Sequence, residues 1–183
     1  MVTAPIDDEP ESHVLFSARM TVEADYGPVA HEALRRLFLH PHAVSPESGA
    51  FAWKNLACLE SAAAQRLQAG KRARIHVEWL KFRQPTSPAT VLATMRARGG
   101  RRAIAQEWLA TLLIHPPLAR ACFSLGSAVR NADGKPILFP SCRISQEHLL
   151  RPLALALAPL DVTGANGSPF RFHPDTAFLA VFD

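Results

Sequence analysis

The sequence predicts an α+β fold in which an antiparallel β-sheet wraps around one helix. The segment at residues 52–68 is rich in alanine and places its larger apolar side chains at helical spacing. Several runs of β-compatible residues follow it, and Gly-Gly and Asp-Gly pairs, which are typical of tight turns, separate some of them. An antiparallel sheet wrapped around one helix is the simplest arrangement that buries the apolar face of each.

Length and composition predict a single domain. The chain has 183 residues, of which 48% are hydrophobic and 20% are charged, so it can bury a sizeable core. Residues 1–12 include a cluster of acidic side chains and are expected to form a disordered lead. Residues 13–183 are expected to form the domain, with a C-terminal extension that begins at about residue 145.

The apolar stretches predict neither a membrane span nor an exported protein. No stretch reaches the roughly 18–20 uninterrupted apolar residues of a membrane helix. The N-terminus lacks the basic start and the apolar run of a secretion signal. We therefore expect a cytoplasmic protein that has no membrane partner.

The charge and the cysteine content indicate which partners, metal sites and disulfides to expect. The formal net charge is +4, and basic residues gather at positions 71–74, 81–83 and 96–102. These clusters either suit the phosphates of coenzyme A or an acidic carrier protein, or form a solvated surface. They accompany no nucleic-acid motif, so no nucleic-acid partner is expected. The three cysteines and eight histidines lack metal-ligand spacing, so we expect no metal site and no disulfide framework.

The first half of the chain is predicted to contain one strand and two helices. Residues 14–22 are rich in β-compatible side chains, and residues 25–28 have turn chemistry. Residues 31–39 place apolar side chains at helical spacing and predict a short helix. Residues 52–68 predict the longest helix, which Gly70 would terminate.

The second half is predicted to consist mainly of strands. Residues 73–79 alternate between apolar and polar side chains, which is the period of a half-buried strand. Turns at Gly99-Gly100 and Asp133-Gly134 are expected to separate further strands over residues 90–98, 102–113, 119–130 and 137–144. A helix over residues 146–157, a loop over residues 161–176 and an edge strand over residues 177–182 complete the predicted order.

Three parts of the sequence resemble the hot-dog superfamily of thioesterases and hydroxyacyl dehydratases. Residues 49–65, GAFAWKNLACLESAAAQ, resemble the central helix, in which many members carry a carboxylate. Residues 77–88, VEWLKFRQPTSP, resemble the passage between strands in which an aromatic residue precedes an Arg and a Pro. Residues 119–124 and 133–136, ARACFS and DGKP, resemble the closing hairpin.

Within this superfamily, the sequence is similar to the FcoT-like long-chain fatty acyl-CoA thioesterases. Residues 28–38, 49–56 and 82–88 carry this similarity. The resemblance implies a hot-dog fold and an activity on acyl-CoA or on an acyl carrier protein, with no metal or redox cofactor. Hot-dog proteins usually pair their sheets across a two-fold axis, so the resemblance also implies a homodimer or a higher homo-oligomer.

Glu60 is the residue expected to carry thioester hydrolysis. The reaction needs an activated water or a carboxylate nucleophile, and a donor for the developing oxyanion. Glu60 lies among apolar neighbours, a setting that favours action as a base or a nucleophile. Asn55 is expected to hold the thioester, together with backbone amides near Phe51 and Trp53 at the helix start.

These residues also have purely structural interpretations. Glu60 can face solvent, Asn55 can be an ordinary polar residue near the helix start, and Trp53 can be a core aromatic instead of a cover for the acyl channel. Asp25 loosely resembles the aspartate in a turn of the four-hydroxybenzoyl-CoA type of thioesterase, which implies a place near the substrate. Aspartate is also common in turns for structural reasons alone.

Two other functions stay open at this level. A 3-hydroxyacyl-thioester dehydratase would use His31 to remove the α-proton and Glu60 to protonate the departing hydroxyl. His31 can equally be a surface histidine at a helix start. The third possibility is a non-catalytic hot-dog protein that only binds acyl groups or serves as a structural subunit.

Overall fold

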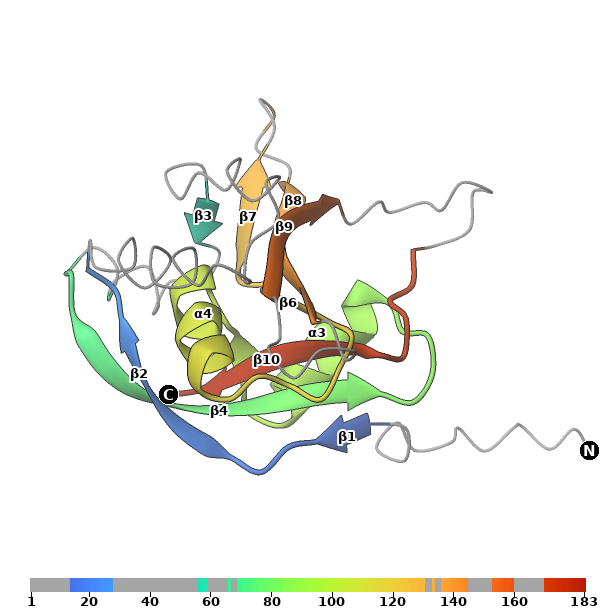
Figure 1. The fold of residues 1–183 in the computed structure, drawn as a ribbon, viewed down its shortest axis with the longest axis horizontal. Helices are drawn as coiled ribbons and strands as arrows, with labels where there is room; N and C mark the ends of the chain where they lie inside the picture. Colours follow the sequence, from blue (N-terminus) through green and yellow to red (C-terminus); the bar gives the residue numbers. More distant parts are fainter. Residues whose placement is uncertain are drawn as a thin grey trace, which may run out of the picture.

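A computed structural model describes residues 14–27, 56–58, 66, 69–130, 133, 136–144, 153–159 and 170–183. Within them the chain forms a ten-stranded sheet and two helices (Figure 1), which confirms the predicted α+β class. Neither of these helices has the length and apolar character needed to cross a membrane. The predicted lead at residues 1–12 and the predicted helix at residues 31–39 lie outside the described residues.

Two long strands form the centre of the sheet. Strand β4 (Arg72–Phe82) runs antiparallel to β10 (Thr176–Phe182), with Leu80 opposite Phe178. The other edge of β4 pairs with β1 (Val14–Phe16) and β2 (Met20–Asp25). The break between β1 and β2 is fixed by the Ser17 hydroxyl, which accepts a 2.9 Å hydrogen bond from the Trp79 backbone N–H. The strands predicted at residues 14–22 and 73–79 are therefore confirmed, the first in two pieces.

The remaining strands extend the sheet beyond β10. Strand β10 pairs in parallel with β6 (Ala121–Phe123) and antiparallel with β5 (Arg101–Arg102). Strand β8 (Pro136–Ile144) pairs antiparallel with β6, with β7 (Ser127–Arg130) and with β9 (Leu153–Pro159). Strand β7 also pairs with β3 (Leu56–Cys58). The predicted strand at 119–130 thus divides into β6 and β7, and β10 is an interior strand instead of the expected edge strand.

The two helices cover opposite faces of the central strands. Side chains alternate along a strand, so Val77 and Trp79 of β4 share one face, while Leu80 and Phe82 share the other. Val77 and Trp79 pack in one core cluster with helix α4 (Ala105–Ile114), and Leu80 and Phe82 pack in a second cluster with helix α3 (Pro88–Ala97). Every residue of β10 is buried. Burial on both faces explains why β10 is almost wholly apolar and shows no polar alternation.

The prediction of a strand at residues 90–98 is wrong, because this segment forms α3. The Ser87 hydroxyl caps the helix by accepting a 3.1 Å hydrogen bond from the Thr90 N–H, and Pro88 occupies the first helical position. Gly99, at φ 73°, ends the helix: its N–H bonds to Arg96 and the Gly100 N–H bonds to Met95, both at 2.9 Å. Gly99-Gly100 therefore stops a helix and does not form the expected hairpin.

The prediction of a strand at residues 102–113 is also wrong, because α4 occupies most of it. The buried side chains of Ala105, Trp108, Leu109 and Leu112 recur at helical spacing. The carboxylate of Glu107, in the first turn, accepts a 3.0 Å hydrogen bond from the Ile104 N–H and satisfies a donor at the helix start. The high apolar content that suggested a strand is instead that of a helix buried against β2 and β4.

Two predicted helices are contradicted in part. Residues 56–58 of the expected long helix form β3, and residues 153–157 of the expected helix at 146–157 belong to β9. Pairing with β7 and β8 satisfies the backbone of both segments and outweighs their local helix propensity. Arg66 is helical, while most of residues 52–68 lie outside the described residues.

Candidate functional site

An apolar groove of about 680 Å³ lies where the end of α4 and the following loop meet the edge of the sheet. Its apolar lining comes from β1, β2 and β4 and from residues 114–118, and includes Leu15, Met20, Trp79, Ile114 and Leu118. Pockets for small molecules are typically concave, about 300–1,000 Å³ in volume and mostly apolar. The groove has the dimensions and the lining of a small-molecule site.

One wall of this groove is the loop that follows α4, which contains two prolines. Helix α4 ends at Ile114, and the following Pro116-Pro117 pair cannot continue it. The Trp79 indole N–H donates a 2.8 Å hydrogen bond to the His115 carbonyl and fixes the loop to the sheet. As a result Ile114 is 59% exposed and Leu118 is 85% exposed, and both line the groove. Gathered exposed apolar side chains of this kind often mark a binding surface.

Lys81 and His115 are the ionisable side chains that the described part of the chain contributes to the groove lining. The Lys81 ammonium forms a 2.5 Å ion pair with Asp175, whose other carboxylate oxygen lies 3.3 Å from the Arg120 guanidinium. The hydrogen bond from Lys81, with the nearby positive charges, lowers the pKa of Asp175. The groove therefore has a polar end that carries more basic than acidic groups.

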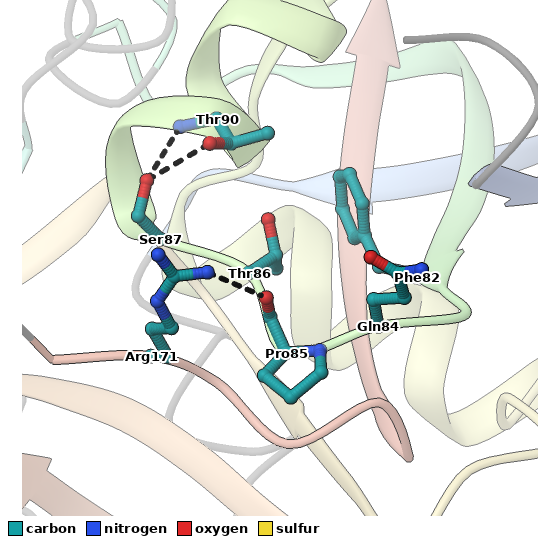
Figure 2. Close-up of a pocket in the computed structure, with 7 residues that line it drawn as sticks. All are labelled: Phe82, Gln84, Pro85, Thr86, Ser87, Thr90 and Arg171. Carbon is teal, nitrogen blue, oxygen red and sulfur yellow. Dashed lines mark hydrogen bonds between the residues drawn. The ribbon is translucent and has the colours of Figure 1, made fainter. Parts of the chain in front are cut away.

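A second, smaller pocket of about 240 Å³ lies at the start of α3 (Figure 2). Two backbone hydrogen bonds, of 3.1 and 2.7 Å, join Thr86 to Phe172 and bring the residue 171 region beside the helix start. The Arg171 guanidinium contacts the Pro85 carbonyl at 3.4 Å. Ser87 and Thr90 complete the polar side of the pocket, and their hydroxyls are 2.9 Å apart.

A buried ionic network joins β2, β5 and α4. Glu107 is 0% exposed, and its carboxylate accepts hydrogen bonds from the Tyr26 hydroxyl at 2.5 Å and from two Arg101 nitrogens at 2.7 and 2.9 Å. Asp183 accepts from Arg101 at 2.7 Å and from Arg66 at 2.5 Å. Buried charges need this kind of complete pairing, and the pairing makes the network a structural element of the fold.

The network shifts two pKa values for clear physical reasons. Burial, followed by the negative charge of Glu107 and its hydrogen bond, raises the pKa of Tyr26 above its ordinary value of 10.0. The hydrogen bond from Arg101 and the further bond from Arg66 lower the pKa of Asp183 to about 2. Both shifts favour the protonation states that the network requires: neutral tyrosine and ionised aspartate.

Cys122 and Cys142 face each other across the β6–β8 pair and are fully buried free thiols. Burial and the neighbouring Cys142 raise the pKa of Cys122 well above its ordinary value. These two cysteines act as small buried hydrophobic side chains. The described residues hold no group of three or more His, Cys, Asp and Glu side chains suited to a metal ion.

Asp25 is the one predicted site residue within the described part of the chain. It lies at the end of β2, where its carboxylate accepts a 2.9 Å hydrogen bond from the Gly27 N–H and a 2.8 Å hydrogen bond from Arg72. It does not line either pocket. The other predicted site residues lie outside the described residues, and their roles stay predictions; these are His31, Phe51, Trp53, Asn55 and Glu60.

Sequence reasoning missed both pockets. The signal for the groove was present in the apolar residues that flank Pro116-Pro117, and the signal for the smaller pocket was the Ser87-Pro88 helix start. Both signals were hidden because the segments beside them were predicted to be strands. Comparison of the chain with protein-family models, with curated proteins and with solved structures gave no match.

Proposed function

We propose that the protein binds acyl thioesters and hydrolyses them, with the apolar groove receiving the acyl chain. The observation that carries this proposal is the groove itself, whose apolar lining ends beside Lys81. Each methylene removed from water contributes about 0.8 kcal/mol. An acyl chain of several methylenes would therefore gain several kcal/mol from such a surface before the entropy lost on binding is subtracted.

The charge at the groove suits an anionic thioester carrier. Lys81 and Arg120 both contact Asp175, which leaves a net positive charge in this cluster. The phosphates of coenzyme A and the surface of an acyl carrier protein are both negative, and such charge complementarity favours their approach. We propose acyl-CoA or an acyl-carrier-protein thioester as the substrate.

The hydrolytic step is assigned to residues identified in the sequence. Glu60 would act as base or nucleophile, and Asn55 would hold the thioester. We further propose a hot-dog type of fold. Residues 56–58 of the predicted central helix form β3, so in this proposal α4 replaces residues 52–68 as the enclosed helix, supported by the complete burial of Trp108 and by its packing against β2 and β4. The parallel β10–β6 pair departs from a wholly antiparallel sheet. Pairing of two copies belongs to the same proposal.

A second candidate is an acyl-binding protein without catalysis. Among the described residues, those that line the groove include a lysine and a histidine but no carboxylate. This observation favours binding over hydrolysis if Glu60 does not reach the groove. The dehydratase, which would need His31 as well, has no comparable support among the described residues.

Thiol release from acyl-CoAs of increasing chain length tests the proposal. We expect hydrolysis to become more efficient as the chain lengthens, until the groove is filled, and to be abolished by Glu60→Gln. Displacement of a fluorescent fatty acid measures binding separately. Binding that persists without thiol release would select the second candidate, and the absence of both would overturn the acyl assignment.

A matched pair of variants tests the groove. Leu118 is 85% exposed and lines the groove, whereas Leu113 is 42% exposed and does not line it. Leu118→Asp should weaken binding of long acyl chains about tenfold, because it places a charge against the chain. Leu113→Asp should leave binding close to that of the wild type. Equal effects of the two variants would exclude the groove as the acyl site.

A further inference from the structure

We propose that the pocket at the start of α3 binds a phosphate group. This pocket lies beside Phe82, which faces the α3 side of the sheet, whereas the apolar groove lies beside Trp79 and Lys81 on the α4 side. It is therefore a separate site, and it does not depend on the acyl function proposed above.

The first observation is the hydroxyl of a largely buried residue, which opens into the pocket and has no hydrogen-bond partner among the described residues. Thr86 is only 6% exposed, and its side chain lines the pocket. Its backbone N–H and carbonyl both bond to Phe172, but among the described residues its hydroxyl makes no hydrogen bond. Figure 2 shows this hydroxyl pointing into the space between the start of α3 and Phe82. A hydroxyl that lines a pocket and bonds to no group of the described residues can donate its proton to a polar ligand.

The second observation is the positive character of the surrounding groups. The start of α3 carries the partial positive charge of the helix dipole, and its first turn contains no acidic residue. Arg171 faces this helix start from the other side of the pocket and, among the described residues, makes one long contact of 3.4 Å to a neutral carbonyl. A guanidinium opposite a helix N-terminus is a favourable setting for a phosphate.

The hydroxyls of Ser87 and Thr90 add further ligands. Ser87 accepts from the Thr90 N–H at 3.1 Å, and the two hydroxyls are paired at 2.9 Å. Each hydroxyl has one proton and two lone pairs, and the hydrogen bond between the two hydroxyls uses only one of their two protons. The other proton remains to be donated to a phosphate oxygen. Hydroxyls, a guanidinium and a helix N-terminus are the groups that commonly bind phosphate in proteins.

The two sides of the pocket are held together before any ligand binds. The paired backbone hydrogen bonds of Thr86 and Phe172, at 3.1 and 2.7 Å, join the segment before α3 to the segment that carries Arg171. Phe172 packs edge-on against Phe178 of β10, with ring centroids 4.6 Å apart. Because these two segments are held together and packed against the core, little ordering of the backbone is needed when phosphate binds.

Titration calorimetry with inorganic phosphate tests this site. Wild-type protein should bind phosphate at millimolar concentration or below, and sulfate should compete with it. Thr86→Val, which keeps the shape and removes the hydroxyl, should weaken binding about tenfold, and Arg171→Gln should weaken it at least as much. Arg171 is exposed, so its variant tests the site even if Thr86→Val is poorly folded.

Two control variants make the same chemical changes elsewhere. Thr94→Val removes a hydroxyl further along α3, where it bonds to the Thr90 carbonyl at 2.9 Å and does not line the pocket. Arg74→Gln removes a positive charge from β4 about 26 Å away from Phe82, at about 3.3 Å per residue. Both controls should bind phosphate as the wild type does.

Comparing inorganic phosphate with phosphate esters shows which kind of ligand the site prefers. Adenosine monophosphate or coenzyme A binding more tightly than inorganic phosphate would indicate a phosphoester ligand, and equal or weaker binding would indicate free phosphate. Either result upholds the site if Thr86→Val and Arg171→Gln weaken it. Binding that these variants leave unchanged, or the absence of binding to folded wild-type protein, would overturn the proposal.

Discussion

The Tyr26 hydroxyl donates a 2.5 Å hydrogen bond to the buried carboxylate of Glu107, although 81 positions separate the two residues. This bond links the end of β2 to the first turn of α4. The same carboxylate is paired with Arg101 at 2.7 Å, which in turn pairs with Asp183 at 2.7 Å. Arg66 joins the same network through Asp183, so it connects four distant parts of the sequence and holds α4 in place against the sheet.

Tyr26→Phe should lower the free energy of unfolding by about 1–3 kcal/mol, because it leaves a buried charged acceptor with one bond fewer. Urea unfolding followed by circular dichroism measures the change. Thr21→Val is a suitable control, since it removes a hydroxyl that makes a 3.2 Å exposed contact with His76. The control should change stability by less than about 0.5 kcal/mol. Equal losses of stability in Tyr26→Phe and Thr21→Val would show that the buried hydrogen bond to Glu107 contributes no more than the exposed contact.

The raised pKa of Tyr26 predicts a loss of stability in alkaline solution. The folded protein holds the phenolic proton more tightly than the unfolded chain, whose tyrosine ionises near pH 10. The contribution is therefore complete below about pH 10 and declines as the pH rises above it. Tyr26 is the one tyrosine of the sequence, so ultraviolet absorbance reports its ionisation directly. A phenolate that forms near pH 10 in still-folded protein would contradict this.

The lowered pKa of Asp183 predicts a loss of stability in acidic solution. Its pKa is lowered to about 2 in the folded state, so its contribution is present above the ordinary value of 3.8 and is lost as the pH falls towards 2. Asp183→Asn should reduce stability at neutral pH and flatten the decline between about pH 4 and pH 2. Stability curves at several pH values measure both effects.

A weak ion pair provides the control for Asp183→Asn. Glu23 lies 3.9 Å from Arg72, and both side chains are largely exposed. Glu23→Gln should change stability at neutral pH by less than about 0.5 kcal/mol. If Asp183→Asn left the loss of stability at low pH unchanged, Asp183 would not be paired with the two arginines in solution.

Two glycines should respond differently to alanine. A β-carbon at Gly126 would lie 2.5 Å from the Ala103 carbonyl oxygen, to which the Gly126 N–H donates. Gly126→Ala should therefore reduce stability by about 1–3 kcal/mol through crowding. Gly99→Ala should cost about 1 kcal/mol, because only the positive φ at this helix end is unfavourable. Thermal unfolding compares the two, and a smaller effect at Gly126 would contradict the close approach.

The sequence was sufficient to predict the long strands and insufficient to predict the helices beside them. Strand β4 was identified because polar and apolar residues alternate over residues 73–79. Segments 90–98 and 102–113 were misassigned because buried helices and strands share a high apolar content. The helix start at Ser87-Pro88 was the more informative signal.

The candidate sites were beyond prediction for a different reason. The groove is assembled from β1, β2, β4, β10 and the loop after α4, and Lys81 meets Asp175 across 94 positions. Periodicity reports the neighbours of a residue within one element and does not report contacts between distant elements. Asp25, in contrast, lies at the end of β2, where its carboxylate accepts a hydrogen bond from the Gly27 N–H, a local contact of the kind that its sequence predicted.

The interior position of β10 has a consequence for synthesis on the ribosome. Both faces of β4 are covered in the folded protein, but its partner β10 is translated roughly a hundred residues later. The emerging chain therefore carries an incomplete sheet, with unpaired hydrogen-bonding groups along one edge of β4, until β10 has been synthesised. Until β10 emerges, the edge of β4 that it covers has no partner, and β10 then completes the sheet by pairing with β4 on one side and with β5 and β6 on the other.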